Sequence, residues 1–332
     1  KIADGVITTN HLNKAMISSQ TEVTAVSGDF LLIGDTSDSN NLKKTPVSSV
    51  KGATDINGLT DAKTFGTGSI MIGDTTTGTI DAANYNTGLG VDIFAALTTG
   101  DENTAIGAFS LGAVTTGRYN TGLGKGTLEA TTTADWNTAV GTNAMQSNTT
   151  GTQNVAVGGS SLDANTNGEN NTAVGYAALG ANTTADDNVA VGAFTLDANT
   201  TGHSNTAVGK SALGANTEGD YNTAVGIRAL EDNTTGSRNT GVGRLSIGNN
   251  TTGNYNTGVG YSSLAVNTTA NYNTALGYGA LAVNTTGSYN VAVGGDALDA
   301  NTTGATNTAV GAEALSANTT GNDNTAVGFD AL

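Results

Sequence analysis

Residues 171–187 read NTAVGYAALGANTTADD, and this stretch decides the fold because the chain repeats its pattern every 17 residues. The pattern has no insertion or deletion in fifteen copies, which begin at Asn86, Asn103, Asn120, Asn137, Asn154, Asn171, Asn188, Asn205, Asn222, Asn239, Asn256, Asn273, Asn290, Asn307 and Asn324. A degenerate copy begins at Ser69. Such regularity is typical of a repeat architecture, in which each unit packs only on its neighbours.

Numbering each copy from 1 to 17 shows which positions are constrained. Position 2 is Thr or Val, position 3 is Ala or Gly, position 4 is aliphatic, position 5 is always Gly, and position 9 is always large and apolar. In the copy at 171–187 these residues are Thr172, Ala173, Val174, Gly175 and Leu179. Two large apolar residues cannot form a core alone, so the copies must stack on one another.

The repeat is too short and too rich in Gly, Thr and Asn to be helical. A helical repeat normally needs about 33 residues or more, and Thr, Val, Asn and Gly are poor helix formers. β-branched residues beside glycine corners suit short strands and tight turns. The sequence therefore predicts an all-β fold, a β-solenoid of 17 residues per coil and about fifteen coils over residues 69–332.

The positions of each coil suggest an interior. We expect Val174 and Leu179 to lie in two apolar ladders inside the solenoid, Gly175 to form a corner, and Asn171 and Asn182 to join hydrogen-bonded amide ladders. Position 3 is small because either the opposite wall or another subunit approaches it. Fifteen coils at about 4.8 Å each give a rod of roughly 70 Å. The open coil at Leu332 predicts that more chain or a partner covers this end.

Residues 1–68 lack the 17-residue period and are expected to form an attachment or neck region. A short helix is predicted over 11–17, a strand over 30–33, and a return strand over 41–47 that contains Pro46. We expect residues 48–68 to lead into the first coil. The region would serve attachment or the seeding of a trimer.

The charge and composition exclude several functions. The net charge of −16 disfavours nucleic-acid binding and attraction to anionic membranes. The chain has no cysteine and no long apolar run, which leaves no disulfide, no thiolate metal site and no membrane insertion. No cofactor is expected.

Residues 171–184, NTAVGYAALGANTT, resemble the repeats of phage tail fibre proteins and are similar to the head repeats of trimeric autotransporter adhesins. Residues 30–44, FLLIGDTSDSNNLKK, resemble a segment near the start of tail fibre proteins of marine phages. The autotransporter repeats are shorter, so their coil geometry is not carried over.

The resemblance implies a homotrimeric fibre, intertwined or side by side, located on the virion. It implies contact with other tail proteins at the N-terminal end and with a host cell-surface receptor, expected to be a glycan, at a distal tip. We therefore expect the shaft of a bacteriophage tail fibre. The alternatives are a trimeric adhesin on the bacterial cell surface and, less favoured, an ice- or glycan-binding solenoid of one chain.

No residue set predicts catalysis or a metal site. The closest carboxylate pairs, Asp186 with Asp187, Glu218 with Asp220 and Glu231 with Asp232, fall at outward positions and are expected to be a solvated acidic surface. Nothing places two of them across a groove as a glycosidase requires. His203 is expected to be an exposed histidine. The sequence therefore predicts a protein that is not an enzyme.

Aromatic residues recur at position 17, among them Tyr221, Tyr255, Tyr272 and Tyr289, and the stripe is densest from Tyr255 to Tyr289. The stripe is expected to stabilise a turn by coil-to-coil stacking or to contact another subunit, rather than to bind a glycan. The paired threonines at positions 13 and 14 are reminiscent of ice-binding solenoids, but they adjoin a glycine corner and variable charges.

Overall fold

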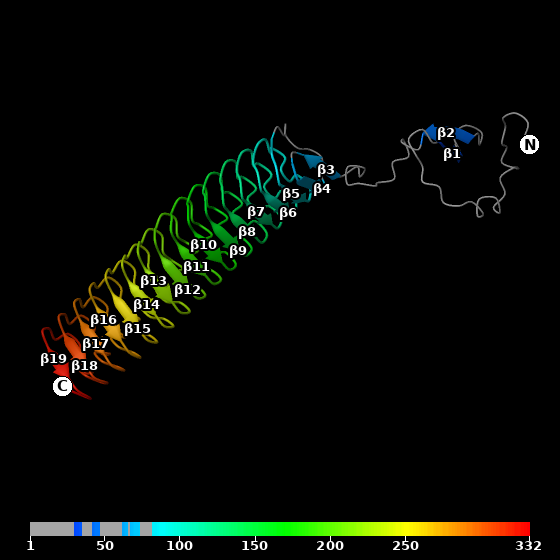
Figure 1. Ribbon diagram of the computed structural model, residues 1–332. Coiled ribbons are helices and arrows are strands. Elements are labelled where there is room, and N and C mark those ends of the chain that lie inside the picture. The colour runs from blue at the N-terminus through cyan, green and yellow to red at the C-terminus, as the bar shows by residue number, and fades with distance from the viewer. Residues whose placement is uncertain (1–29, 35–41, 47–61, 66, 74–81) are drawn as a thin grey trace, which may run out of the picture. The chain divides into compact units, whose positions relative to one another are not determined.

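The computed structural model describes residues 30–34, 42–46, 62–65, 67–73 and 82–332, and these residues form only strands, turns and loops. The chain divides into two compact units, Lys1–Thr60 and Asp61–Leu332. The predicted all-β class and β-solenoid are both confirmed (Figure 1). The helix predicted over 11–17 lies outside the described residues, and the neck at 48–68 is described only in part.

The described residues of the first unit, 30–34 and 42–46, form one pair of strands. β1 (Phe30–Gly34) and β2 (Leu42–Pro46) are antiparallel, with Phe30 opposite Pro46 and Gly34 opposite Leu42. They coincide with the strands expected over 30–33 and 41–47. Pro46 ends its strand, where the missing backbone N–H costs the ladder least.

The second unit is a single coiled stack of short strands. β3 (Ala62–Phe65) pairs antiparallel with β4 (Ser69–Ile72), and β4 pairs parallel with the first strand of the regular repeat. The regular strands follow at intervals of 17 residues: β5 (Thr87–Leu89), β6 (Thr104–Ile106), β7 (Thr121–Leu123), β8 (Thr138–Val140), β9 (Val155–Val157), β10 (Thr172–Val174), β11 (Val189–Val191), β12 (Thr206–Val208), β13 (Thr223–Val225), β14 (Thr240–Val242), β15 (Thr257–Val259), β16 (Thr274–Leu276), β17 (Val291–Val293), β18 (Thr308–Val310) and β19 (Thr325–Val327).

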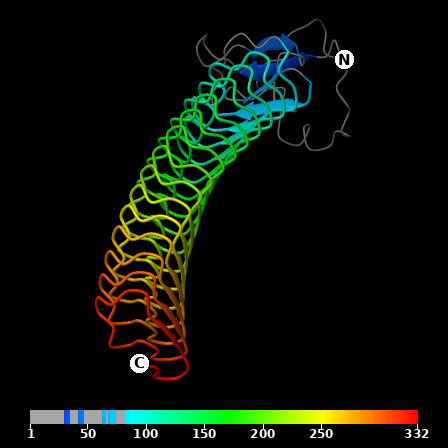
Figure 2. The same ribbon diagram turned by 90° about the vertical axis from the view of Figure 1, so that its left-hand side faces the viewer.

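Each strand pairs with the equivalent strand of the next coil. Thr172 lies opposite Val155 on one side and Val189 on the other, so residues at the same repeat position are neighbours. The strands form one parallel sheet along the side of the unit, which is a long, gently curved stack of coils (Figure 2). The identity of the coils has a physical reason, because each coil is the template on which the next one pairs.

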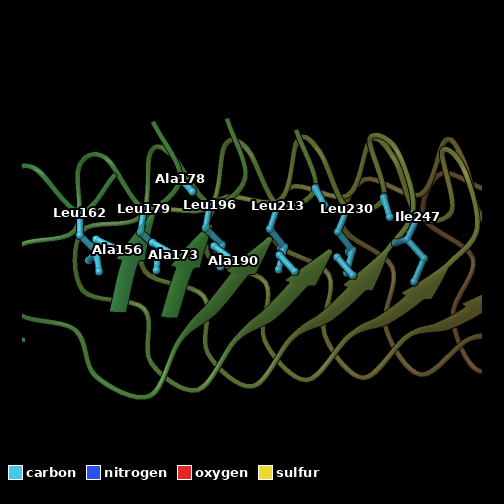
Figure 3. Packing of buried hydrophobic residues seen from close by; sticks show 14 of the residues in the cluster. Ala156, Leu162, Ala173, Ala178, Leu179, Ala190, Leu196, Leu213, Leu230 and Ile247 are labelled. Carbon is cyan, nitrogen blue, oxygen red and sulfur yellow. The ribbon is translucent and has the colours of Figure 1, made fainter. Parts of the chain in front are cut away.

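The apolar interior consists of position 9 side chains together with small residues at positions 3 and 8, such as Ala173 and Ala178. The leucines of successive coils, such as Leu179 and Leu196, project toward the alanines of the strands, such as Ala173 and Ala190 (Figure 3). All four residues are fully buried. The core is therefore a narrow column with one leucine layer per coil.

The prediction that Val174 forms an inner ladder is wrong. Alternate residues of a strand face opposite sides, and in β10 Ala173 is the buried residue while Thr172 and Val174 are only half-buried. The same holds for the other position 4 residues, of which Leu89 is 50% exposed. Position 4 therefore faces outward, and only Leu179 of the two predicted residues lines the core.

The small size of position 3 is explained by the opposite wall of the same solenoid. A Cβ added to Gly88 would lie 2.6 Å from Ile93 Cδ1, and one added to Gly241 would lie 3.3 Å from Leu230 Cγ. Ala173 is fully buried inside its own coil. Position 3 residues are therefore not available as a contact between subunits.

The turns use left-handed backbone at residues other than glycine. Leu179 has φ of 52° and Ala177 has φ of 53°, and the position 9 residue is left-handed in every copy. Side chains normally disfavour this region. Here the conformation turns each position 9 side chain into the core, and Leu179 N donates to Thr195 O of the next coil.

Candidate functional site

Two buried columns of asparagine hold the coils together. Asn171 Nδ2 donates to Ala185 O at 2.8 Å within its coil, and Asn171 Oδ1 accepts from Asn188 N at 3.0 Å in the next coil. Asn182 Nδ2 donates to Asn165 Oδ1 at 2.9 Å. These two predicted ladder residues are therefore fully paired inside the solenoid and are not accessible to a ligand.

Gly175 occupies the corner after the strand, and its backbone needs glycine. Its φ is 138°, and a Cβ there would lie 2.4 Å from Gly192 O. Equivalent glycines meet in the same way along the whole stack. This column of backbone contacts fixes the corner of every coil.

The four tyrosines predicted as a surface stripe lie in one column. Tyr255 and Tyr272 stack with ring centroids 4.8 Å apart and planes at 5°, and Tyr272 and Tyr289 stack at 5.0 Å and 8°. Tyr221 joins them through Arg238, whose guanidinium lies 5.4 Å from its ring centroid and 5.3 Å from that of Tyr255. Sequence reasoning missed Arg238, although it occupies position 17 of the coil between these two tyrosines.

This column presents ring edges and hydroxyls rather than ring faces. Each face of Tyr272 is covered by a neighbouring tyrosine, although 46% of the residue is exposed. Sugar rings stack on aromatic faces, which are free here only at the ends of the column. The arrangement favours coil-to-coil stabilisation over glycan stacking along the stripe.

A second column occupies position 6, just after the same strands. Arg244 Nη1 donates to Tyr261 Oη at 3.1 Å and lies over the Tyr261 ring, which stacks on Tyr278 at 5.5 Å. Position 17 lies two residues before the first residue of each strand, and position 6 follows the corner glycine. The two columns therefore flank the outward side of β14, β15 and β16.

The outward side chains at positions 2 and 4 of β5–β19 form what we call the strand face. It consists of Thr or Val at position 2 and Val, Leu or Ile at position 4, with no charged residue in any coil. Leu89 is 50% exposed, Leu123 44% and Leu276 38%. An exposed aliphatic row of this length is unusual on a solvated surface, and it is the most distinctive outer feature of the solenoid.

The predicted acidic pairs have structural roles. Asp186 Oδ1 accepts from Glu169 N, and Asp220 Oδ1 accepts from His203 N, each at 2.7 Å. His203 Nδ1 in turn accepts from Asp186 N at 2.9 Å. Position 16 is therefore an acceptor ladder from coil to coil rather than a free surface position.

The remaining carboxylates in the part of the chain that the structure describes do not converge on a site. Glu231 forms an ion pair with Arg228. Burial raises the pKa of Asp163 and Asp197, and burial together with Asp296 raises the pKa of Asp299. Within the described ranges, no group of three or more His, Cys, Asp or Glu side chains is placed to hold a metal ion.

The threonine array at position 13 also holds coils together. Thr183 Oγ1 donates to Thr200 O at 3.3 Å, and Thr200 Oγ1 donates to Thr217 O at 3.0 Å. These hydroxyls are used internally along the solenoid. The ice-binding alternative was based on the threonine pairs at positions 13 and 14. The position 13 hydroxyls already donate within the solenoid, which weakens that alternative.

Comparison with known proteins gives no family for this chain. No protein-family model matches the sequence, and no curated protein matches it. Among the residues that the structure describes, no helix is long and apolar enough to cross a bilayer.

Proposed function

We propose that this chain is the shaft of a bacteriophage tail fibre, a rigid element that sets the distance between an attachment region at 1–68 and a host receptor-binding element. The observation that carries the proposal is the uninterrupted stack: fifteen copies without an insertion. Buried columns such as that of Asn171 and Asn188 join every coil to the next. A uniform, cross-bonded rod resists bending and offers no variable loops for catalysis.

The proposed partners follow from the resemblance of the repeats and of residues 30–44 to tail fibre proteins. Three copies would lie parallel in a homotrimeric fibre on the virion. Other tail proteins would hold the N-terminal region, and a host surface glycan would be the receptor. No reaction, cofactor or metal is part of the proposal.

The second candidate is a trimeric adhesin of the bacterial surface, which the resemblance to autotransporter head repeats favours. Both candidates use a stiff rod, so they differ in location rather than in geometry. Immunogold labelling with an antibody against residues 86–332 separates them in an infected culture. Gold on phage tails supports the fibre, and gold on uninfected cells supports the adhesin.

Particle shape and mass test the shaft itself. Negative-stain microscopy is expected to show slender particles of uniform width with a solenoid about 70 Å long, given about 4.8 Å per coil. Light scattering is expected to give a mass near three times the chain mass of 32.8 kDa. Round or flexible particles would contradict the shaft.

A further inference from the structure

The strand face lacks charge in a chain that is otherwise strongly acidic. Carboxylates occupy many other outward positions, such as Asp92 at position 7, Glu218 at position 14 and Asp220 at position 16. None occurs at position 2 or position 4 of any strand from β5 to β19. A surface facing only water would have no physical reason to exclude charge, because charge favours solubility. A surface that an apolar partner covers must lack charge, because burying an unpaired charge is costly.

The strand face is also large enough for a stable interface. Its fifteen coils span about 70 Å at about 4.8 Å per coil, and two outward residues per strand give a width of about 10 Å. The resulting area of roughly 700 Å² is close to the roughly 800 Å² per partner of standard interfaces. Its always aliphatic half, the position 4 row, is comparable with the largest apolar patch of a typical monomer, about 300–600 Å².

The spacing of the strand face specifies its occupant. Side chains such as Val208, Val225 and Val242 follow one another at the distance between paired strands, without a break from β5 to β19. A partner that buries the whole row must offer apolar groups at the same period over the same length. Another copy of this chain has that period in every coil.

We propose that the strand face is the surface through which copies of this chain pack on one another, parallel and with equivalent coils side by side. The assignment rests on the proposed fibre only in that it names the contact between its chains. It replaces position 3 as the shared surface, since Ala173 and its equivalents are buried within one chain.

Within the proposed fibre the chains run parallel, because equivalent chains around one fibre axis point in the same direction. Tyr255 and Tyr261 flank the same strand, β15. Parallel packing sets them at the same height as their equivalents in the neighbouring copy.

Single cysteines test both the face and the direction, because the chain has no cysteine of its own. Leu123→Cys, Val208→Cys and Val310→Cys place one thiol near the start, middle and end of the strand face. Under oxidation or with a short bis-maleimide linker, each variant is expected to cross-link to its own equivalent. Thr201→Cys, exposed at position 14, is the matched control and is expected to remain uncross-linked.

The cross-linking pattern distinguishes the proposed packing from the alternatives. Equal cross-linking at all three sites supports the proposal. Cross-linking at Val208→Cys alone indicates an antiparallel crossing and overturns it. Cross-linking only at Thr201→Cys, or at none of the four sites, also overturns it.

A charge placed on the face provides an independent test. The double variant Val208→Glu, Val242→Glu is expected to give the mass of one chain, 32.8 kDa, with an unchanged circular dichroism spectrum. Thr201→Glu, Thr235→Glu is the control, because position 14 already carries Glu218 in the native chain. An unchanged mass for the first variant would overturn the interface. Slender rods with the mass of one chain in the native protein would overturn the interface but leave the shaft, whereas cross-linked particles that are not rods would overturn the shaft alone.

Discussion

The side-chain oxygen of Asn171 accepts a hydrogen bond from the backbone amide of Asn188, 3.0 Å away in the next coil. The side-chain nitrogen of Asn171 donates to Ala185 O at 2.8 Å in its own coil. A single buried amide thus closes one coil and anchors the next. The same pair of bonds recurs along the stack. One side chain therefore serves both coil closure and coil stacking, which accounts for asparagine at position 1 of every copy.

Removing this amide is expected to open the solenoid locally. Asn171→Ala leaves Asn188 N buried without its acceptor, which costs about 1–3 kcal/mol. Ala185 O keeps only the bond from Asn182 Nδ2 at 3.1 Å. Hydrogen exchange of the amides in residues 171–205 should accelerate correspondingly. Asn167→Ala, an exposed asparagine at position 14, is expected to leave these rates unchanged, and equal rates in the two variants would contradict the role of the ladder.

Two glycines of one coil are expected to respond differently to alanine. Gly175 has φ of 138° and has Gly192 O 2.4 Å from its added Cβ, whereas the Cβ added to Gly180 meets nothing closer than Ala177 O at 3.4 Å. Gly175→Ala should therefore destabilise the coil by more than about 1 kcal/mol, while Gly180→Ala should be neutral or slightly stabilising. Thermal unfolding followed by circular dichroism compares the two. A similar loss for both would show that the corner does not depend on the backbone of Gly175.

The two aliphatic residues of the coil are also expected to differ. Leu179→Ala empties a layer of the core and should cost about 2–5 kcal/mol. Val174→Thr changes an outward side chain of similar shape and should stay within about 0.5 kcal/mol for the fold of the chain. Hydrogen exchange of amides within the coil measures both, at a protein concentration low enough to dissociate any assembly. A larger loss for Val174→Thr would place position 4 inside after all.

The tyrosine column is expected to stabilise the coils that it spans. Tyr272→Ala removes two stacked contacts, each worth about 0.5–1.5 kcal/mol. Protection of amides between residues 256 and 290 should fall, while Tyr272→Phe, which keeps both ring faces, should retain it. Loss in both variants would assign the effect to the hydroxyl instead of the stack.

Two half-buried carboxyls are expected to make stability depend on pH. Burial raises the pKa of Asp163 and Asp197 above the ordinary value of 3.8. The folded chain therefore binds these protons more tightly than the unfolded chain, so their contribution to stability is largest at low pH. That contribution is lost as the pH rises from about 3.8 through the raised folded-state pKa values.

The double variant Asp163→Asn, Asp197→Asn should remove this dependence, because the neutral amide has no charge to desolvate. It is expected to unfold at a higher temperature than the native chain at pH 7, and the difference should vanish below pH 3.8. Asp187→Asn, an exposed carboxylate, is the control. A difference that persists at low pH would mean that the aspartates act through contacts other than their charge.

Most of the architecture could be predicted from the repeat, because equivalent residues of neighbouring coils are alike and stack on one another. The 17-residue period, the amide columns of Asn171 and Asn182, and the corner at Gly175 all follow from residues that recur at fixed positions. A column of like residues that pair with their own kind is visible in one sequence. The phage assignment and the trimer remain proposals that neither the sequence nor the fold tests.

The sequence by itself determined that the chain stacks in coils of 17 residues, since the period and its recurrent Asn, Gly and large apolar positions require neighbours. Only the tertiary structure decided which way each strand faces. A three-residue strand is too short for alternation to choose a side, so Ala173 and Val174 are equally plausible as core residues until the opposite wall is placed. The left-handed backbone at Leu179 turns that leucine toward Ala173, and the narrow space left between the walls admits only the smaller side chain. Val174 is thereby turned outward, because the volume inside a coil is fixed by both walls together and not by either segment alone.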